Sequence, residues 1–228
     1  MFNKIDASGF EYSTQIYERE FLKILAGIIS CYKMMIQSNV SLPNNENRIR
    51  DIIYNNYLKN NKMRNQLKLI PYIIDCEVAE YDNKGKLMGY VDYKISTQNT
   101  FIDTNAYYII ECKRLDNTNT TGTTGLNAEY IKNGILRFVN KKYSSYYKVN
   151  GMIGFIVARM DINSNVKNIN ELLKNNFKKA NTKKELTPDS FINNFNSAYF
   201  SGHNDKNKKD LKLYHLMFDF SKNMEITN

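Results

Sequence analysis

An acid and a lysine close an apolar run near the middle of the chain. Residues 107–110 read Tyr-Tyr-Ile-Ile and lead directly into Glu111, Cys112 and Lys113. Such a run is typical of a buried strand, in which alternate side chains share a face. Glu111 and Lys113 therefore point the same way, with Cβ atoms roughly 6.5–7 Å apart, and Cys112 points to the apolar side. Because a buried charge is costly unless it is paired or bound to metal, we expect this strand to end at a rim that an acid and an amine share.

A further acid lies on the preceding predicted strand. Asp92, in "MGYVDYKIS", stands nineteen positions before Glu111. If the two strands are neighbours, the two carboxylates meet at one rim and repel each other unless a cation lies between them. Mg²⁺ prefers oxygen ligands and keeps several waters, so two carboxylates and a phosphate oxygen would suit it. Lys113 would then orient or deprotonate a water and neutralise charge in the transition state.

Other residues fit the same pattern less well. Asp92, Tyr93 and Lys94 form an earlier acid-x-Lys triplet, for which Asp75 or Glu77 is a possible first acid. We prefer Glu111 because the run before it is longer and more apolar, as in a central strand. Asp103 precedes Glu111 by only eight positions and is expected in a connecting turn. Glu111 and Lys113 also fit a surface ion pair on an edge strand.

Periodicity predicts the elements that position these residues. Helical spacing of apolar residues predicts helices over residues 18–37, 46–67, 126–142 and 169–180. Apolar or alternating runs predict strands over residues 72–82, 86–96, 105–115, 151–160 and 212–220. Gly85 is expected at positive φ in the turn between the first two strands. The order predicts one α/β domain with a central mixed sheet between helices, divided into an N-terminal helical extension (1–45), a core (46–160) and C-terminal helices and a strand (161–228).

Composition limits the class of protein and its partners. The chain has 228 residues, and a hydrophobic share of 42% excludes general disorder. A formal charge of +9 favours a polyanionic partner such as nucleic acid, or an acidic membrane surface. No apolar stretch reaches the ~20 residues that a bilayer requires, and residues 1–13 lack the apolar core of a signal peptide. We therefore expect a cytoplasmic protein whose three scattered cysteines are reduced.

Four more residues are candidates for the site, each with a structural alternative. Glu46 begins a predicted helix, where an acid also stabilises the N-terminus. Tyr130 and Arg137 lie on the helix after the third strand; Tyr130 equally fits the core, and Arg137 fits either a phosphate contact or a solvated position. His203 is expected on a polar loop, where it could contact nucleic acid, whereas His215 fits a packed strand position.

The segments "GYVDYK" and "YYIIECKRL" resemble the PD-(D/E)xK nuclease superfamily, which includes restriction endonucleases and phage-defence effectors. In that resemblance Asp92 matches the first acid, Glu111 the second and Lys113 the lysine. Glu46 matches an acid that many members carry on the preceding helix. Tyr130 lies where some members carry Gln-x-x-x-Tyr, with leucine in place of the glutamine. The resemblance covers roughly residues 46–160.

The resemblance implies a restriction endonuclease-like core with the order α-β-β-β-α-β. It also implies DNA phosphodiester hydrolysis that depends on Mg²⁺ or Mn²⁺, with Asp92, Glu111 and the backbone carbonyl of Cys112 as metal ligands. Tyr130, Arg137 and His203 would contact the nucleic acid. Cutting both strands would require two active sites, so a homodimer or a larger defence complex is expected. The alternative is a nucleic-acid-binding subunit that retains this fold without cleavage.

Overall fold

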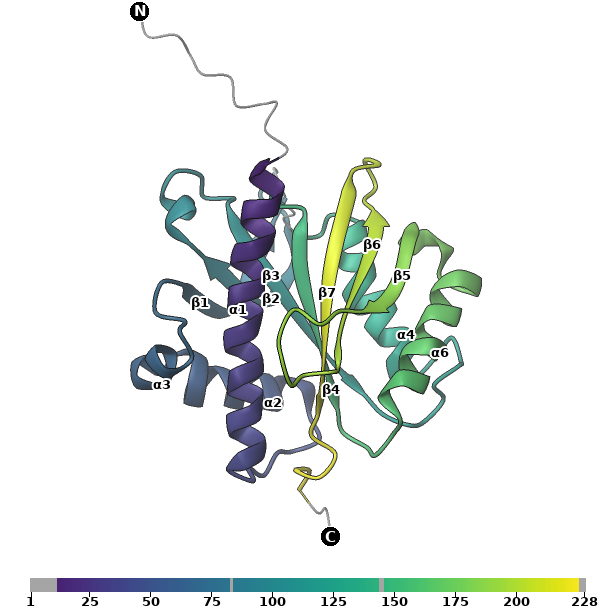
Figure 1. Ribbon diagram of the computed structural model, residues 1–228. Coiled ribbons are helices and arrows are strands. Elements are labelled where there is room, and N and C mark those ends of the chain that lie inside the picture. Colours follow the sequence, from purple (N-terminus) through teal and green to yellow (C-terminus); the bar gives the residue numbers. More distant parts are fainter. Residues whose placement is uncertain (1–11, 83, 144–145, 226–228) are drawn as a thin grey trace, which may run out of the picture.

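A seven-stranded mixed sheet flanked by helices forms the body of the protein (Figure 1). The computed structural model describes residues 12–82, 84–143 and 146–225. The strand order is β1-β2-β3-β4-β7-β6-β5. β3, β4 and β7 are parallel, and the remaining neighbours are antiparallel. The expected α/β class with a central mixed sheet is confirmed, and the ranges 46–160 and 161–228 both contribute strands to the one sheet.

The strands and helices have the following bounds. The strands are β1 Ile73–Tyr81, β2 Leu87–Ser96, β3 Tyr107–Leu115, β4 Val149–Ile156, β5 Thr182–Pro188, β6 Ala198–Asn204 and β7 Asp210–Asp219. The α-helices are α1 Tyr12–Gln37, α2 Glu46–Ile53, α3 Asn61–Gln66, α4 Leu126–Tyr130, α5 Leu136–Val139 and α6 Ile162–Asn175. Short 3₁₀ or π segments are η1 Tyr54–Leu58, η2 Gln98–Phe101, η3 Ile131–Ile135 and η4 Lys178–Ala180.

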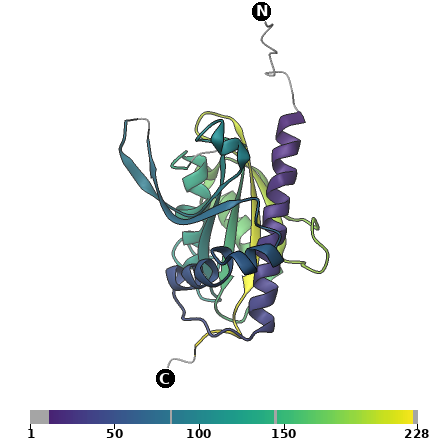
Figure 2. The same cartoon turned by 90° about the vertical axis from the view of Figure 1, so that its left-hand side faces the viewer.

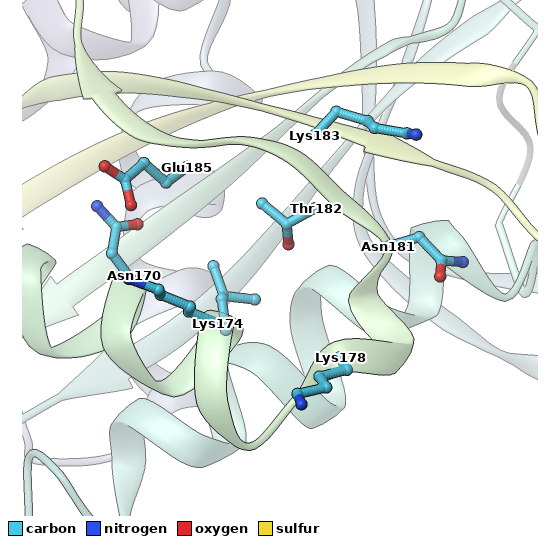
Figure 3. A pocket seen from close by; sticks show the side chains of 8 residues that line it. Asn170, Lys174, Lys178, Asn181, Thr182, Lys183 and Glu185 are labelled. Atoms are coloured by element: carbon cyan, nitrogen blue, oxygen red, sulfur yellow. The ribbon is translucent and has the colours of Figure 1, made fainter.

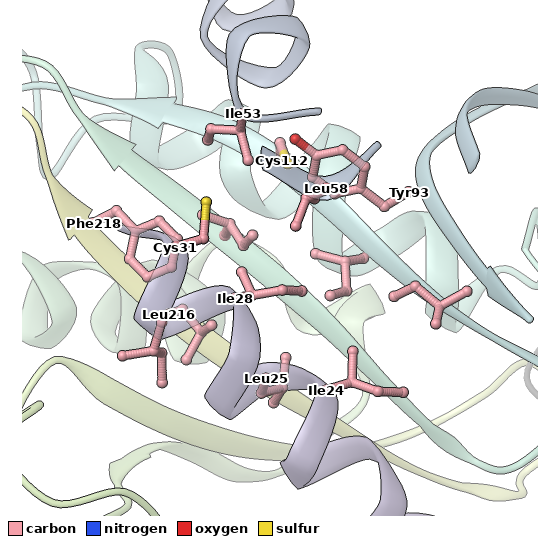
Figure 4. Close-up of a cluster of buried hydrophobic side chains, with 14 of the residues drawn as sticks. Ile24, Leu25, Ile28, Cys31, Ile53, Leu58, Tyr93, Cys112, Leu216 and Phe218 are labelled. Atoms are coloured by element: carbon pink, nitrogen blue, oxygen red, sulfur yellow. The ribbon is translucent and has the colours of Figure 1, made fainter. Parts of the chain in front are cut away.

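Two hydrophobic clusters cover the two faces of the sheet. Alternation along β3 places Tyr108, Ile110 and Cys112 in the cluster that includes α1 and α2. Ile109 and Leu115 belong to the cluster under α4, η3, α5 and α6. Figure 4 shows the first cluster, with α1 lying across the sheet and Cys112 among its apolar side chains. Cys112 therefore faces the apolar side, as expected, and Glu111 and Lys113 face the opposite side.

A fork opens in the sheet between β2 and β3. The two strands pair only from Tyr93, opposite Ile110, to Ser96, opposite Tyr107. The rest of β2 pairs with β1 as far as Leu87. Figure 2 shows this β1–β2 hairpin projecting from the body on the side away from α1. Gly85, in the turn, has φ +75°, in agreement with its expected conformation.

The structure corrects several predicted elements. The helix predicted over 46–67 is broken into α2, η1 and α3, and the helix over 126–142 contains a π segment. The C-terminal part holds three strands instead of one, because β5 and β6 join β7. β5 was missed because this edge strand exposes most of its side chains and its sequence, "TKKELTP", is polar. In β6, small and polar residues mask the alternation that indicates a strand.

Two expectations concern membranes and export. No helix within the described part of the chain is long and apolar enough to cross a membrane. Residues 1–11, on which the expected absence of a signal peptide mainly depends, lie outside the described residues.

Candidate active site

The fork brings Asp92 beside β3. Asp92 lies one residue beyond the last β2–β3 pair, and its carboxylate Oδ2 accepts a 2.7 Å hydrogen bond from the Cys112 backbone N–H. The side chain thus satisfies a backbone donor at the point where the ladder stops. Asp92 is only 8% exposed. Asp92 and Glu111 thus lie on neighbouring strands, which is the condition for their carboxylates to meet at one rim.

Lys113 lies at the centre of the acids. Its Nζ is 2.8 Å from Glu111 Oε1, and it is 4.0 Å from Asp92 Oδ2. It also donates hydrogen bonds to the backbone carbonyl of Cys112 at 2.6 Å and to Glu46 Oε1 at 3.0 Å. Burial alone would lower the pKa of Lys113, but the carboxylates outweigh this effect and raise the pKa above its ordinary value. Lys113 therefore remains a cation at neutral pH.

Glu111 is completely buried and is held on both oxygens. Arg137, on α5, contacts Oε1 at 2.8 Å, and the Tyr143 hydroxyl donates to Oε2 at 2.7 Å. Arg137 also donates to the Tyr143 hydroxyl. Burial and then the neighbouring charge of Asp92 raise the pKa of Glu111 to about 7, against the opposing effects of Lys113 and Arg137. The Asp92 carboxylate therefore disfavours the charged form of Glu111.

Glu46 serves the helix and the site together. It occupies the first turn of α2, after the Asn45 cap, where a negative charge is favourable. Its Oε2 accepts the Arg114 backbone N–H at 2.9 Å, and its Oε1 meets Lys113. The carboxylate thus joins the start of α2 to the end of β3. Both interpretations of Glu46, helix terminus and site residue, agree with its position.

Two residues at the site were not anticipated. Arg50 is 4% exposed, and it donates to Asp92 Oδ1 at 2.9 Å while also contacting Asp51 and Glu77. Tyr143 follows α5 and reaches Glu111 from there. Arg50 could have been noticed as a basic residue on the apolar side of α2, one turn after Glu46. Tyr143 carries no comparable sequence signal.

The competing acid-x-Lys triplet is assembled differently. Lys94 Nζ lies over the ring of Tyr107, 3.9 Å from its centroid, at the opposite end of β3 from Lys113. Asp103 accepts hydrogen bonds from Asn105 in its own turn. Neither residue belongs to the group around Lys113.

Of the three residues expected to contact nucleic acid, Arg137 contacts Glu111 at the site, and its side chain is 29% exposed.

Two residues expected to contact nucleic acid are buried instead. Tyr130 is fully buried on α4, and His203 lies on β6, not on a loop, with 1% exposure. A chain of hydrogen bonds connects them: Tyr130 Oη to His215 Nδ1 at 2.8 Å, His215 Nε2 to Ser201 Oγ at 2.7 Å, and Ser201 Oγ to His203 Nε2 at 2.8 Å. These partners form hydrogen bonds with the polar atoms inside the core, so the residues can be buried. The sequence does not show these partners, and the expected loop position of His203 is therefore wrong.

The atoms that meet at the fork are carboxylate and carbonyl oxygens, the kind of ligand that hard divalent cations such as Mg²⁺ prefer. Carboxylate oxygens of Asp92 and Glu111 and the carbonyl of Cys112 all surround Lys113 Nζ, so they already favour positive charge at one place. No group of three or more acids, histidines or cysteines within the described residues is close enough to hold a metal ion. Glu46 joins the two acids through Lys113, whose Nζ its Oε1 meets at 3.0 Å, while its Oε2 accepts the Arg114 backbone N–H.

Comparisons with known proteins complete the description of the site. Neither protein-family models, nor curated proteins, nor solved structures give a match to this chain. The residues at the fork and their contacts therefore carry the functional argument by themselves.

Proposed function

We propose that this protein is a metal-dependent nuclease of the PD-(D/E)xK type that hydrolyses DNA, with its active site at the β2–β3 fork. The observation that carries the proposal is the cluster around Lys113, in which two strand-borne carboxylates and the Cys112 carbonyl surround one ammonium group. The order of elements also supports it. From α2 through β1, β2, β3 and the α4–α5 segment to β4, the chain follows α-β-β-β-α-β, the order of a restriction endonuclease-like core.

In this proposal Asp92, Glu111 and the Cys112 carbonyl hold Mg²⁺ or Mn²⁺. The metal would polarise a phosphate oxygen and increase the acidity of a bound water. Each ligand is oriented by its neighbours, since Arg50 holds Asp92 while Arg137 and Tyr143 hold Glu111. Preorganised ligands avoid the cost of reorientation during the reaction.

Lys113 acts as a fixed positive charge in this scheme. Its raised pKa favours orientation of the water and stabilisation of negative charge on the phosphate over removal of a proton. Glu46 keeps the ammonium group at the fork through the 3.0 Å contact with Nζ. Arg137 is the one expected nucleic-acid contact that retains solvent exposure at the site, so a role on a phosphate remains part of the proposal.

The test is cleavage of supercoiled plasmid DNA with Mg²⁺ or Mn²⁺. Wild type is expected to nick or linearise the plasmid. Lys113→Met, which keeps the aliphatic stem but removes the charge, should lower the rate by about a hundredfold or more. Lys94→Met is the matched control, because Lys94 belongs to the competing triplet, and its rate should stay near that of wild type. The proposal is contradicted if wild type cleaves the plasmid with neither Mg²⁺ nor Mn²⁺. It is also contradicted if Lys94→Met loses cleavage while Lys113→Met keeps it.

A nucleic-acid-binding subunit without cleavage is the second candidate function. The observation in its favour is that the carboxylates do not need a metal as a partner. Every oxygen of Asp92 and Glu111 already contacts a donor or a cation of the protein. Asp92→Asn separates the two functions. If cleavage disappears while DNA affinity is kept, the enzyme proposal holds; if wild type binds DNA and never cleaves it, alone or as a homodimer or within a larger defence complex, the binding function holds.

A further inference from the structure

A groove beside the candidate active site lies between the projecting hairpin and the body. It encloses about 480 Å³. The hairpin contributes Tyr81, Lys84 and Met88, while the segment after α5 and the β6–β7 turn contribute Lys141, Lys142 and Lys206. Tyr143 lines the groove and also donates to Glu111. The groove is thus continuous with the acids at the fork through one side chain.

The groove carries an excess of uncompensated positive charge. Lys84, Lys142 and Lys206 are exposed, and none of them pairs with an acid within the described residues. Two acids, Glu80 and Asp82, also line the groove, so its four lysines outnumber its acids. Glu80 accepts the Tyr107 hydroxyl at 2.8–2.9 Å, and Asp82 accepts backbone N–H groups in its own hairpin turn. Lysines from three separate segments therefore present charge to one space, which favours a polyanion.

Exposed aromatic rings accompany these lysines. Tyr81 is 62% exposed where it lines the groove. Tyr90, farther along the hairpin toward the fork and outside the lining of the groove, is 51% exposed, and its carbonyl oxygen lies 2.9 Å from the Tyr143 hydroxyl oxygen. Such rings leave apolar surface in water unless a planar partner covers them. In a duplex, base faces are stacked on one another and only the backbone and base edges are accessible, whereas a single strand offers base faces.

We propose that this groove binds single-stranded nucleic acid, with Lys84, Lys142 and Lys206 on the phosphates and the ring of Tyr81 stacked on a base. The placement of the strand next to a cleavage site rests on the proposed function. Binding itself does not, because Lys84, Lys142, Lys206 and Tyr81 lie outside the acid cluster.

Another lysine-lined pocket provides the control. It encloses about 440 Å³ between α6, η4 and β5, and its lysines are Lys174, Lys178 and Lys183 (Figure 3). None of its lining residues is aromatic. Replacing these three lysines changes the net charge as much as replacing the three in the groove. A general effect of charge should therefore appear in both triple variants.

The experiment measures fluorescence anisotropy of labelled DNA in EDTA, so that no cleavage occurs. The probe is an oligonucleotide of about 20 nucleotides, longer than the roughly 4–16 that one single-strand site covers, tested alone and as a duplex. Wild type should bind the single strand more tightly. Lys84→Ala/Lys142→Ala/Lys206→Ala should weaken binding at least tenfold and reduce the salt slope by about 2, given roughly 0.7 per phosphate contact. Tyr81→Ala should cost about fivefold or more and Tyr81→Phe little, because the ring is retained.

The outcomes are separable. Tighter binding of the duplex, or equal losses in the groove and Lys174/Lys178/Lys183→Ala variants, overturns the groove assignment. If wild type cleaves plasmid and the groove variants bind as wild type does, the groove proposal is wrong and the nuclease proposal stands. If single-strand binding behaves as expected and no metal supports cleavage, the nuclease proposal is wrong and the groove proposal stands.

Discussion

At the scale of single residues, charge balance dominates the candidate site. Glu111, Lys113 and Arg50 are each less than 10% exposed, and each contacts at least one group of opposite charge. Removing Asp92 or Glu111 takes one acid from a buried cation, which leaves Arg50 or Lys113 less well compensated by its remaining partners. An alanine at Asp92 or Glu111 should therefore destabilise the protein in the absence of metal. These cations only partly offset burial and the repulsion between the carboxylates, because the pKa of Glu111 stays raised.

Burial opposes the protonation of His203 and outweighs the hydrogen bond to the Ala180 carbonyl, which favours the charged ring. Its Nδ1 lies 3.0 Å from the Ala180 carbonyl oxygen, which can only accept, so Nδ1 carries the hydrogen. Nε2 must then accept from Ser201, and the Ser201 oxygen accepts from His215 Nε2. A second proton, at His203 Nε2, would require Ser201 and His215 to reverse these hydrogen bonds. Burial lowers the pKa of His203 to about 4, and it also lowers the pKa of His215.

Stability should therefore fall in acid. Between pH 6.5 and about 4 the unfolded state binds a proton at His203 and the folded state does not, so the free energy of unfolding decreases as the pH falls through this range. The loss from this one residue is on the order of 3 kcal/mol. His203→Asn keeps a donor for the Ala180 carbonyl and removes the titration. Urea denaturation at several pH values should show a shallower acid decline in this variant, and parallel declines in the two proteins would contradict the interpretation.

At the scale of elements, the site depends on close approach between helices and the sheet. α2 must lie near the β3 end for Glu46 and Arg50 to reach the fork, and α1 packs against the same face of the sheet. Gly27 allows α1 to approach the segment between α3 and β1. A Cβ added there would lie 2.8 Å from the Leu67 carbonyl oxygen and 2.6 Å from Leu69 Cδ2. Because one of these atoms is backbone, the contact cannot be relieved by a rotamer change alone.

Gly27→Ala should destabilise the protein although alanine is the better helix former. The propensity gain is about 1 kcal/mol, while overpacking of this kind costs about 1–3 kcal/mol. The expected net result is a lower melting temperature. Lys23→Ala, at an exposed position of the same helix, is the control and should change stability by less than about 0.5 kcal/mol. A rise in melting temperature for Gly27→Ala would show that α1 shifts freely.

At the scale of the whole molecule, metal binding and folding are linked. A cation bound only by the folded state stabilises it by about 2.7 kcal/mol at a hundredfold excess over Kd, or roughly 5–10 °C for a chain of this size. Excess Mn²⁺ or Mg²⁺ should therefore raise the melting temperature of wild type at low salt and fixed pH. The increase should shrink in Asp92→Ala and in Glu111→Ala, each compared with its own metal-free melt. Equal increases in all three proteins would place the ions elsewhere.

Local patterns in the sequence determined the central strands and the side on which their residues lie. The period of two along β3 placed Glu111 and Lys113 together and Cys112 in the core, because alternation is a property of the strand itself. The short turn at Gly85 likewise determined that β1 and β2 pair as a hairpin. The helix following β3 was also recognisable from its spacing, although its π segment was not.

Only the tertiary structure decided which partners surround the acids. Arg50 meets Asp92 across 42 positions of sequence, and Tyr143 meets Glu111 across 32. No local pattern encodes such contacts, because they arise when separate elements pack on one sheet. His203 illustrates the same limit in reverse. Its polar surroundings in the sequence indicate a loop. In β6, however, Ser201 and the Ala180 carbonyl are hydrogen-bond partners for both ring nitrogens, which lowers the free-energy cost of burying them.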